Sequence, residues 1–161
     1  MKTFTFAKLP ENLAELQALP EAALTDPFAT AALTAAVLCN YEKNVDATIE
    51  MLNFLKGPQP LSPFEKQFLR DRLVGKSYVP RSYFAGTSPA NNYTPSVPYT
   101  ITVEENPYSY SQEHYAVLWI KSSGADSPRQ VKMRSKGENW YLWEQFLLPD
   151  IRIPAEQDPW A

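Results

Sequence analysis

The chain has 161 residues, of which 44% are hydrophobic and 20% are charged, so it is long enough to bury a core of its own. The formal net charge is −3, and residues 58–161 carry equal numbers of basic and acidic side chains. This balance disfavours a broad basic face, so we expect no nucleic-acid partner bound by neutralising its phosphates.

The sequence contains one cysteine, Cys39, and one histidine, His114. A disulfide within the chain and a zinc site built from Cys and His alone are therefore both impossible. No apolar run approaches the ~18 residues that span a membrane, and the N-terminus lacks the apolar stretch of a signal peptide. We expect a cytoplasmic protein with no membrane partner, no metal site and no cofactor.

Residues 1–75 form a predicted helical half. Helical patterns occur in four places, at residues 10–19, 27–41, 44–56 and 62–74. The second pattern is apolar nearly all round, which is typical of a central helix that packs on several sides. The fourth begins with a capping box at Ser62 and Glu65, and we expect its core face to consist of Phe64, Phe68, Leu69 and Leu73. Residues 1–9 are predicted to form a short strand or arm.

Residues 99–161 form a predicted β-rich half. Alternating apolar residues predict strands at 99–104, 115–121, 130–135 and 140–144. The strand at 115–121 is apolar on both faces, so we place it centrally in a sheet that is covered on both sides. Trp160 near the C-terminus is expected to pack against the core. Helices followed by strands indicate an α+β fold, with about four N-terminal helices packed on an antiparallel sheet of four to five strands.

A Pro- and Tyr-rich stretch, residues 76–98, joins these halves within one predicted domain, residues 1–161. It shows neither helical nor strand periodicity, and connectors of this length in compact domains are usually functional or disordered. Its tyrosines and asparagines disfavour disorder, so we expect an ordered strap across the sheet. Two interpretations remain: the aromatic side chains fix the strap to the core, or they form a binding surface.

The loop at residues 122–129 is the most concentrated polar stretch. We expect Gly124 to adopt a positive φ in a hairpin loop that is shaped by its own side chains. The alternative is that Arg129 and the loop amides capture an anion. A basic strip of Arg129, Lys132, Arg134 and Lys136 follows along one strand. It is either a solvated sheet face or a surface for an acidic partner or ligand.

Tyr and Arg dominate binding hot spots, and the strap is rich in tyrosine and carries Arg81. The favoured hypothesis is therefore a non-catalytic binding or interaction domain, whose partner is another protein or a second copy of the chain. The residues expected to bind the partner are Arg81, Tyr83, Asn91, Asn92, Tyr93, Asp126 and Arg129.

Catalytic patterns are scarce, and the sequence therefore favours a protein that is not an enzyme. A Ser-His-Asp triad would need His114, which opens a predicted strand and is expected at the surface. The sequence has neither a nucleophile elbow nor a phosphate-binding loop. The alternative hypothesis is a small-ligand protein or enzyme with a pocket between the helices and a curved sheet, lined by Trp119, Trp140 and Trp143.

Several strings are distinctive when taken together, namely LPEAALTDPFATAAL (19–33), MLNFLKGPQPLSPFEKQFLRDRL (51–73), YVPRSYFAGTSPANNYTPSVPYT (78–100), SSGADSPR (122–129), WYLWEQFLL (140–148) and DPWA (158–161). On these strings, residues 7–161 resemble a family of small, uncharacterised bacterial domains of unknown function. The resemblance implies a bacterial protein with a single domain, and it implies no activity, cofactor or catalytic residue.

Overall fold

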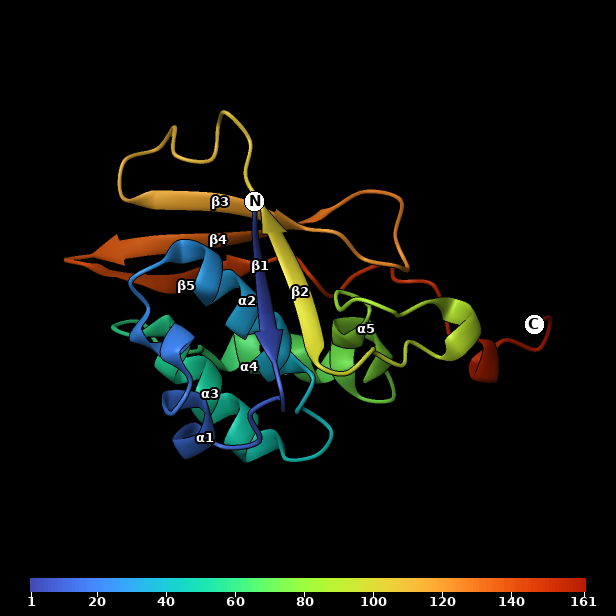
Figure 1. The fold of residues 1–161 in the computed structure, drawn as a ribbon. Coiled ribbons are helices and arrows are strands. Elements are labelled where there is room, and N and C mark those ends of the chain that lie inside the picture. The colour runs from blue at the N-terminus through green and yellow to red at the C-terminus, as the bar shows by residue number, and fades with distance from the viewer.

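The computed structural model describes residues 1–161 and shows a five-stranded antiparallel sheet with the helices on one side of it (Figure 1). The strands follow chain order in the sheet: β1 (Lys2–Phe6), β2 (Tyr99–Glu104), β3 (Tyr115–Ile120), β4 (Arg129–Lys136) and β5 (Asn139–Gln145). The predicted α+β class is confirmed. The N-terminal residues form a strand that pairs along β2 at the sheet edge.

Five α-helices and three short 3₁₀ helices complete the fold. The α-helices are α1 (Leu13–Gln17), α2 (Pro27–Leu38), α3 (Val45–Lys56), α4 (Pro63–Leu73) and α5 (Tyr78–Arg81). The 3₁₀ helices are η1 (Pro20–Ala23), η2 (Pro89–Asn91) and η3 (Ala155–Gln157). None of these helices is long and apolar enough to cross a lipid bilayer.

Helix α2 is the centre of the fold, because all twelve of its residues are buried. Asp26 caps it by accepting a hydrogen bond from the Phe28 N–H at 2.9 Å. The two buried threonine hydroxyls are also satisfied. Thr30 donates to the carbonyl of Trp140 at 2.7 Å, and Thr34 donates to the carbonyl of Thr30 at 2.8 Å. A helix with no polar face can therefore sit inside the curve of the sheet and contact all five strands.

The sheet divides between β2 and β3. These strands pair over only two residue pairs, Val103 with Ile120 and Glu104 with Trp119, whereas β3 and β4 pair over six. Beyond that point the connection from β2 to β3 lies beside β3, where the Val117 N–H donates to the Ser109 carbonyl at 2.9 Å. The β1–β2 ribbon therefore turns away from β3–β5, and both parts wrap α2 (Figure 1).

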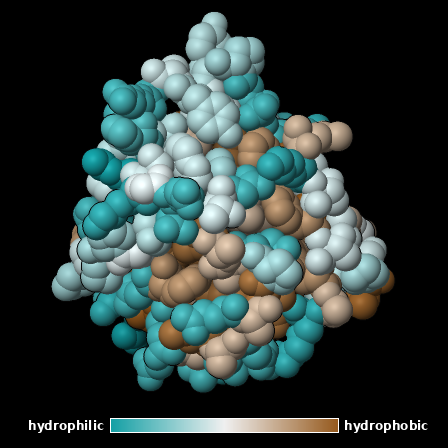
Figure 2. Space-filling view, turned by 60° about the vertical axis from the view of Figure 1, so that its left-hand side comes forward, coloured by the Kyte–Doolittle hydropathy of each residue, from teal (hydrophilic) through white to brown (hydrophobic).

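Strand β3 has one buried face and one partly exposed face. Ala116, Leu118 and Ile120 are buried, whereas Tyr115, Val117 and Trp119 alternate with them and are half-buried. The sequence predicts a sheet that is covered on both sides, its second face by helices or by a dimer partner. Helices do not cover this second face, because every helix lies on the α2 side (Figure 1). Cover by a dimer partner stays a prediction. Figure 2 shows the β2–β3 connection as a hydrophilic rim, with hydrophobic surface gathered mainly below it.

The strap at residues 76–98 is ordered and contains α5 and η2. The rings of Tyr78 and Tyr93 stack inside it, with centroids 5.6 Å apart. The C-terminal segment runs alongside the strap, and the Glu156 N–H donates a hydrogen bond to the side chain of Asn92. Trp160 lies beyond this contact and is 93% exposed, so the expectation that it packs is wrong.

Candidate functional site

The strap residues predicted to bind a partner use most of their polar groups inside the chain. The Arg81 guanidinium donates to the carbonyls of Tyr93 and Asn92 at 3.0 and 3.1 Å and to the Ser77 hydroxyl at 3.2 Å. Asn91 caps η2 by accepting from the Ser88 N–H and donates to the Gly86 carbonyl at 2.8 Å. Arg81 therefore closes the strap upon itself.

Tyr83 and Tyr93 are buried, and each hydroxyl donates to a carbonyl of the C-terminal segment. Tyr83 binds the carbonyl of Leu147, and Tyr93 binds that of Arg152 at 2.6 Å. Burial raises the pKa of both phenols. The tyrosines thus fix the strap to the C-terminal segment, which is the first of the two interpretations offered by the sequence.

The loop at residues 122–129 meets the strap through Gly124. A Cβ added there would lie 2.3 Å from the Tyr93 hydroxyl oxygen, so this glycine is required for close approach. The expectation that Gly124 has a positive φ is wrong.

The charged residues of this loop also have partners within the chain. Asp126 forms an ion pair with Arg152. Arg129 donates to the Asp150 carbonyl at 3.3 Å, while its buried Nε lacks a partner. Binding through the strap and loop residues stays a prediction, for which Asn91 and Asp126 are the exposed members.

The three tryptophans lie at separate places. Trp119 is on the exposed face of β3, opposite Glu104 of β2. The Trp140 ring packs edge-on against Tyr110, and the backbone N–H of Trp140 donates to the Leu24 carbonyl. The indole of Trp143 packs edge-on against Tyr115, and only Trp143 borders the groove described next.

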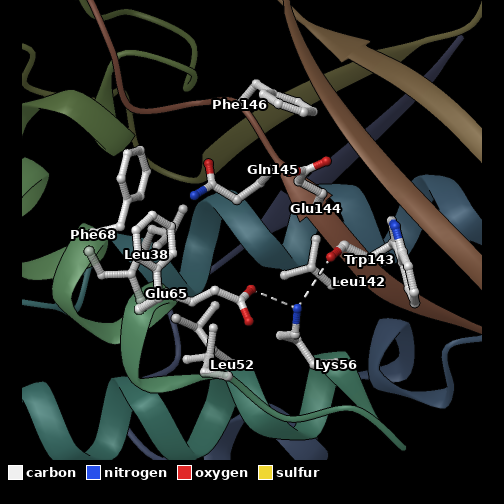
Figure 3. Close-up of a pocket in the computed structure, with 13 residues that line it drawn as sticks. Leu38, Leu52, Lys56, Glu65, Phe68, Leu142, Trp143, Glu144, Gln145 and Phe146 are labelled. Carbon is white, nitrogen blue, oxygen red and sulfur yellow. Dashed lines mark hydrogen bonds and ion pairs between the residues drawn. The ribbon is translucent and has the colours of Figure 1, made fainter.

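A groove runs between helices α3 and α4 and strand β5 (Figure 3). We call it the α4 groove. Its volume is about 310 Å³, and nine of its thirteen lining residues are hydrophobic. These nine are Leu38, Leu52, Leu61, Phe64, Phe68, Leu69, Leu142, Trp143 and Phe146, and the polar four are Lys56, Glu65, Glu144 and Gln145.

Lys56 occupies one end of the groove. It is the last residue of α3, its side chain is only 6% exposed, and its ammonium donates to Glu65 Oε2 at 3.0 Å and to the Trp143 carbonyl at 3.2 Å. Figure 3 shows the Trp143 carbonyl turned towards Lys56 and the indole ring turned away. The lysine therefore joins the end of α3 to the start of α4 and to β5.

Glu65 belongs both to this ion pair and to the cap of α4. Its Oε1 accepts from the Ser62 N–H at 3.0 Å, while the Ser62 hydroxyl accepts from the Glu65 N–H. Burial alone would raise the pKa of Glu65, but the hydrogen bonds from Ser62 and Lys56 outweigh it, and the pKa lies below its ordinary value. A charged carboxylate is therefore held at the rim of an otherwise apolar groove.

Phe64 stands at the open side of the groove and is 79% exposed, so its predicted place in the core is wrong. At about 100° per residue, Phe64 points opposite Leu73, which is nine positions later, and only Leu69 and Leu73 of α4 are buried. Phe64 and Phe68 form a second apolar stripe. This angular offset is the sequence signal that could have revealed the groove.

A second hollow of about 350 Å³ adjoins the first and shares Lys56, Leu142 and Trp143 with it. Arg134 and Lys136 of β4 line this hollow, and no carboxylate does. We call it the basic hollow. It contains two of the four residues in the predicted basic strip, and no sequence pattern placed them beside an apolar groove.

The structure contains no group of three or more His, Cys, Asp or Glu side chains placed to hold a metal ion, and His114 is exposed. A central helix wrapped by an antiparallel sheet, with an apolar groove beside one strand, defines the chain as an α+β protein. The chain belongs to the family described as Domain of unknown function (DUF6935), which matches residues 8–155. The expected membership of an uncharacterised family is thus confirmed. Neither the curated proteins nor the solved structures contain a match.

Proposed function

We propose that this chain is a binding domain that holds an apolar group of a small ligand in the α4 groove. The observation that carries the proposal is Phe64, a phenyl ring that stays largely exposed at the rim of a groove lined mainly by apolar side chains. Exposed apolar surface gathered in one hollow marks a binding site more often than scattered surface residues do.

A small ligand fits this groove better than a folded partner. Its volume of about 310 Å³ lies at the lower end of small-molecule sites, which are mostly apolar with a few polar groups. A stable protein interface instead covers roughly 800 Å² on each partner. Burying apolar surface in the groove stabilises the complex by roughly 25 cal/mol per Å².

A titration with the neutral fluorescent amine N-phenyl-1-naphthylamine tests the proposal. We expect saturable binding by the unaltered chain, and binding about tenfold weaker for Phe64→Ser, which removes one ring from the site. Phe64→Ser should keep its melting temperature because the ring is exposed.

Tyr108→Ser is the matched control, since Tyr108 is 75% exposed and lies outside the groove. Its affinity should equal that of the unaltered chain. The absence of saturable binding, or equal affinity in Phe64→Ser and the unaltered chain, would contradict the proposed site.

A further inference from the structure

The basic hollow differs in charge from the α4 groove that it adjoins. Lys56, Arg134 and Lys136 line the hollow without any carboxylate, whereas Glu65 and Glu144 line the groove. An anionic group placed in the groove would meet two carboxylates beside Lys56. The same group placed in the hollow would meet Lys56 and two further cations, with no carboxylate among the lining residues.

Lys56 stands where the two hollows meet. An ammonium has three N–H donors, and the Lys56 ammonium uses two of them, on Glu65 and on the Trp143 carbonyl. The third donor is not matched by any acceptor of the chain. A ligand that crosses this junction can therefore accept a charge-assisted hydrogen bond from a buried cation without breaking the Glu65 pair.

Arg134 is held in place before any ligand arrives. Its guanidinium lies over the rings of Tyr115 and Trp143, 5.0 and 5.1 Å from their centroids, and it also donates to the Tyr115 hydroxyl. A fixed guanidinium loses little side-chain entropy when it binds an anion. Lys136 forms no ion pair and is exposed at the end of β4, so its ammonium is free to bind the same anion as Arg134.

We propose that the ligand is an amphipathic anion, whose apolar body lies in the α4 groove and whose carboxylate or phosphate lies in the basic hollow. This inference rests on the proposed function, because it needs the groove to bind the apolar body. Beyond the proposed function, we infer the charge of the ligand and the direction in which the ligand lies across Lys56.

Displacement of N-phenyl-1-naphthylamine by four ten-carbon compounds, each below its micelle concentration, tests the inference. The compounds are decanoate, decyl phosphate, decanol and decyltrimethylammonium. We expect at least one of the two anions to displace the probe at a concentration about tenfold lower than decanol does. The tighter of the two anions identifies the headgroup as carboxylate or phosphate.

Lys136→Gln should weaken binding of the tighter anion far more than binding of decanol, and so remove most of the preference for an anion. Lys76→Gln, at an exposed lysine that lines neither hollow, is the matched control and should change neither. Equal affinity for decanol and both anions, tighter binding of the cationic compound, or an unchanged preference in Lys136→Gln would overturn the inference and leave the proposed groove standing. If the probe itself does not bind, both proposals fail.

Discussion

The ammonium of Lys56 lies 3.0 Å from the carboxylate of Glu65, across the junction between the end of α3 and the first turn of α4. The lysine is almost fully buried, whereas the Glu65 side chain is 40% exposed. The pair therefore fixes two helices at the site while its carboxylate still faces water. Solvent screening on the Glu65 side limits the stability that the pair contributes.

Removing the charge of Glu65 should destabilise the fold in a pH-dependent way. Glu65→Gln keeps an acceptor for the Ser62 N–H but loses the ion pair, and we expect a loss of about 1 kcal/mol at neutral pH. The folded-state pKa of Glu65 is lowered from 4.5, so its stabilisation is complete above that value. As the pH falls through the lowered pKa, this stabilisation is lost, and the two proteins converge.

Urea unfolding between neutral and acidic pH measures this difference. Glu50→Gln is the control, because Glu50 is exposed on α3 and forms no ion pair. A stability difference between Glu65→Gln and the unaltered chain that stayed constant down to the lowest pH would show that the ion pair is not its source.

Gly57 should not tolerate a side chain. Its φ is +63°, and an added Cβ would lie 2.3 Å from Cδ1 of Tyr141. We expect Gly57→Ala to lower the free energy of unfolding by about 2–5 kcal/mol, from backbone strain and overpacking together. Gly75→Ala isolates the strain, because Gly75 has φ +73° and open space around it. Chemical denaturation of both variants should rank Gly57→Ala as clearly the less stable, and equal losses would argue against the contact with Tyr141.

The hydroxyl of Tyr93 should contribute to stability. Tyr93 is fully buried and donates to the Arg152 carbonyl, so Tyr93→Phe leaves an acceptor without its partner and should cost about 1–3 kcal/mol. Tyr108→Phe, at an exposed tyrosine, should cost nothing. Thermal unfolding checks both, and a Tyr93→Phe protein as stable as the unaltered chain would show that the strap is held without this bond.

The two faces of α4 should respond differently to truncation. Leu69→Ala opens a cavity in the core and should cost about 2–5 kcal/mol, because Leu69 is buried. Phe64→Ala should change stability by less than about 0.5 kcal/mol, because Phe64 is exposed. The urea unfolding midpoints of the two variants measure both changes in stability. A large loss of stability in Phe64→Ala would show that the Phe64 ring is part of the core.

Local patterns were enough to predict most of the secondary structure. The apolar circumference of α2, the capping box at Ser62 and the alternation in β3 each depend on neighbours within a few residues. The predicted ends of the helices and strands were less accurate. Helix α2 ends at Leu38 rather than at residue 41, and the residues that follow it form turns. These ends depend on packing partners that are distant in sequence.

The candidate site depends on contacts that no local pattern contains. Lys56 and Trp143 are 87 residues apart, and the hydrogen bond between them exists only once β5 lies beside α3. The buried roles of Tyr83 and Tyr93 likewise require the C-terminal segment. Residue types typical of a binding surface were therefore predicted at positions where the fold uses them for internal packing.

Methyl-resolved NMR with N-phenyl-1-naphthylamine can show whether the α4 groove binds an apolar ligand, because it locates the bound molecule without a substitution. We expect a saturable shift in the methyl signals of Leu52, Leu61, Leu69 and Leu142, which line the α4 groove. The methyl signals of Ile101, Leu118 and Ile120, which are buried in strands that do not line the groove, should stay in place. Shifts confined to that second set, or no shifts at all, would show that the α4 groove is not the binding site.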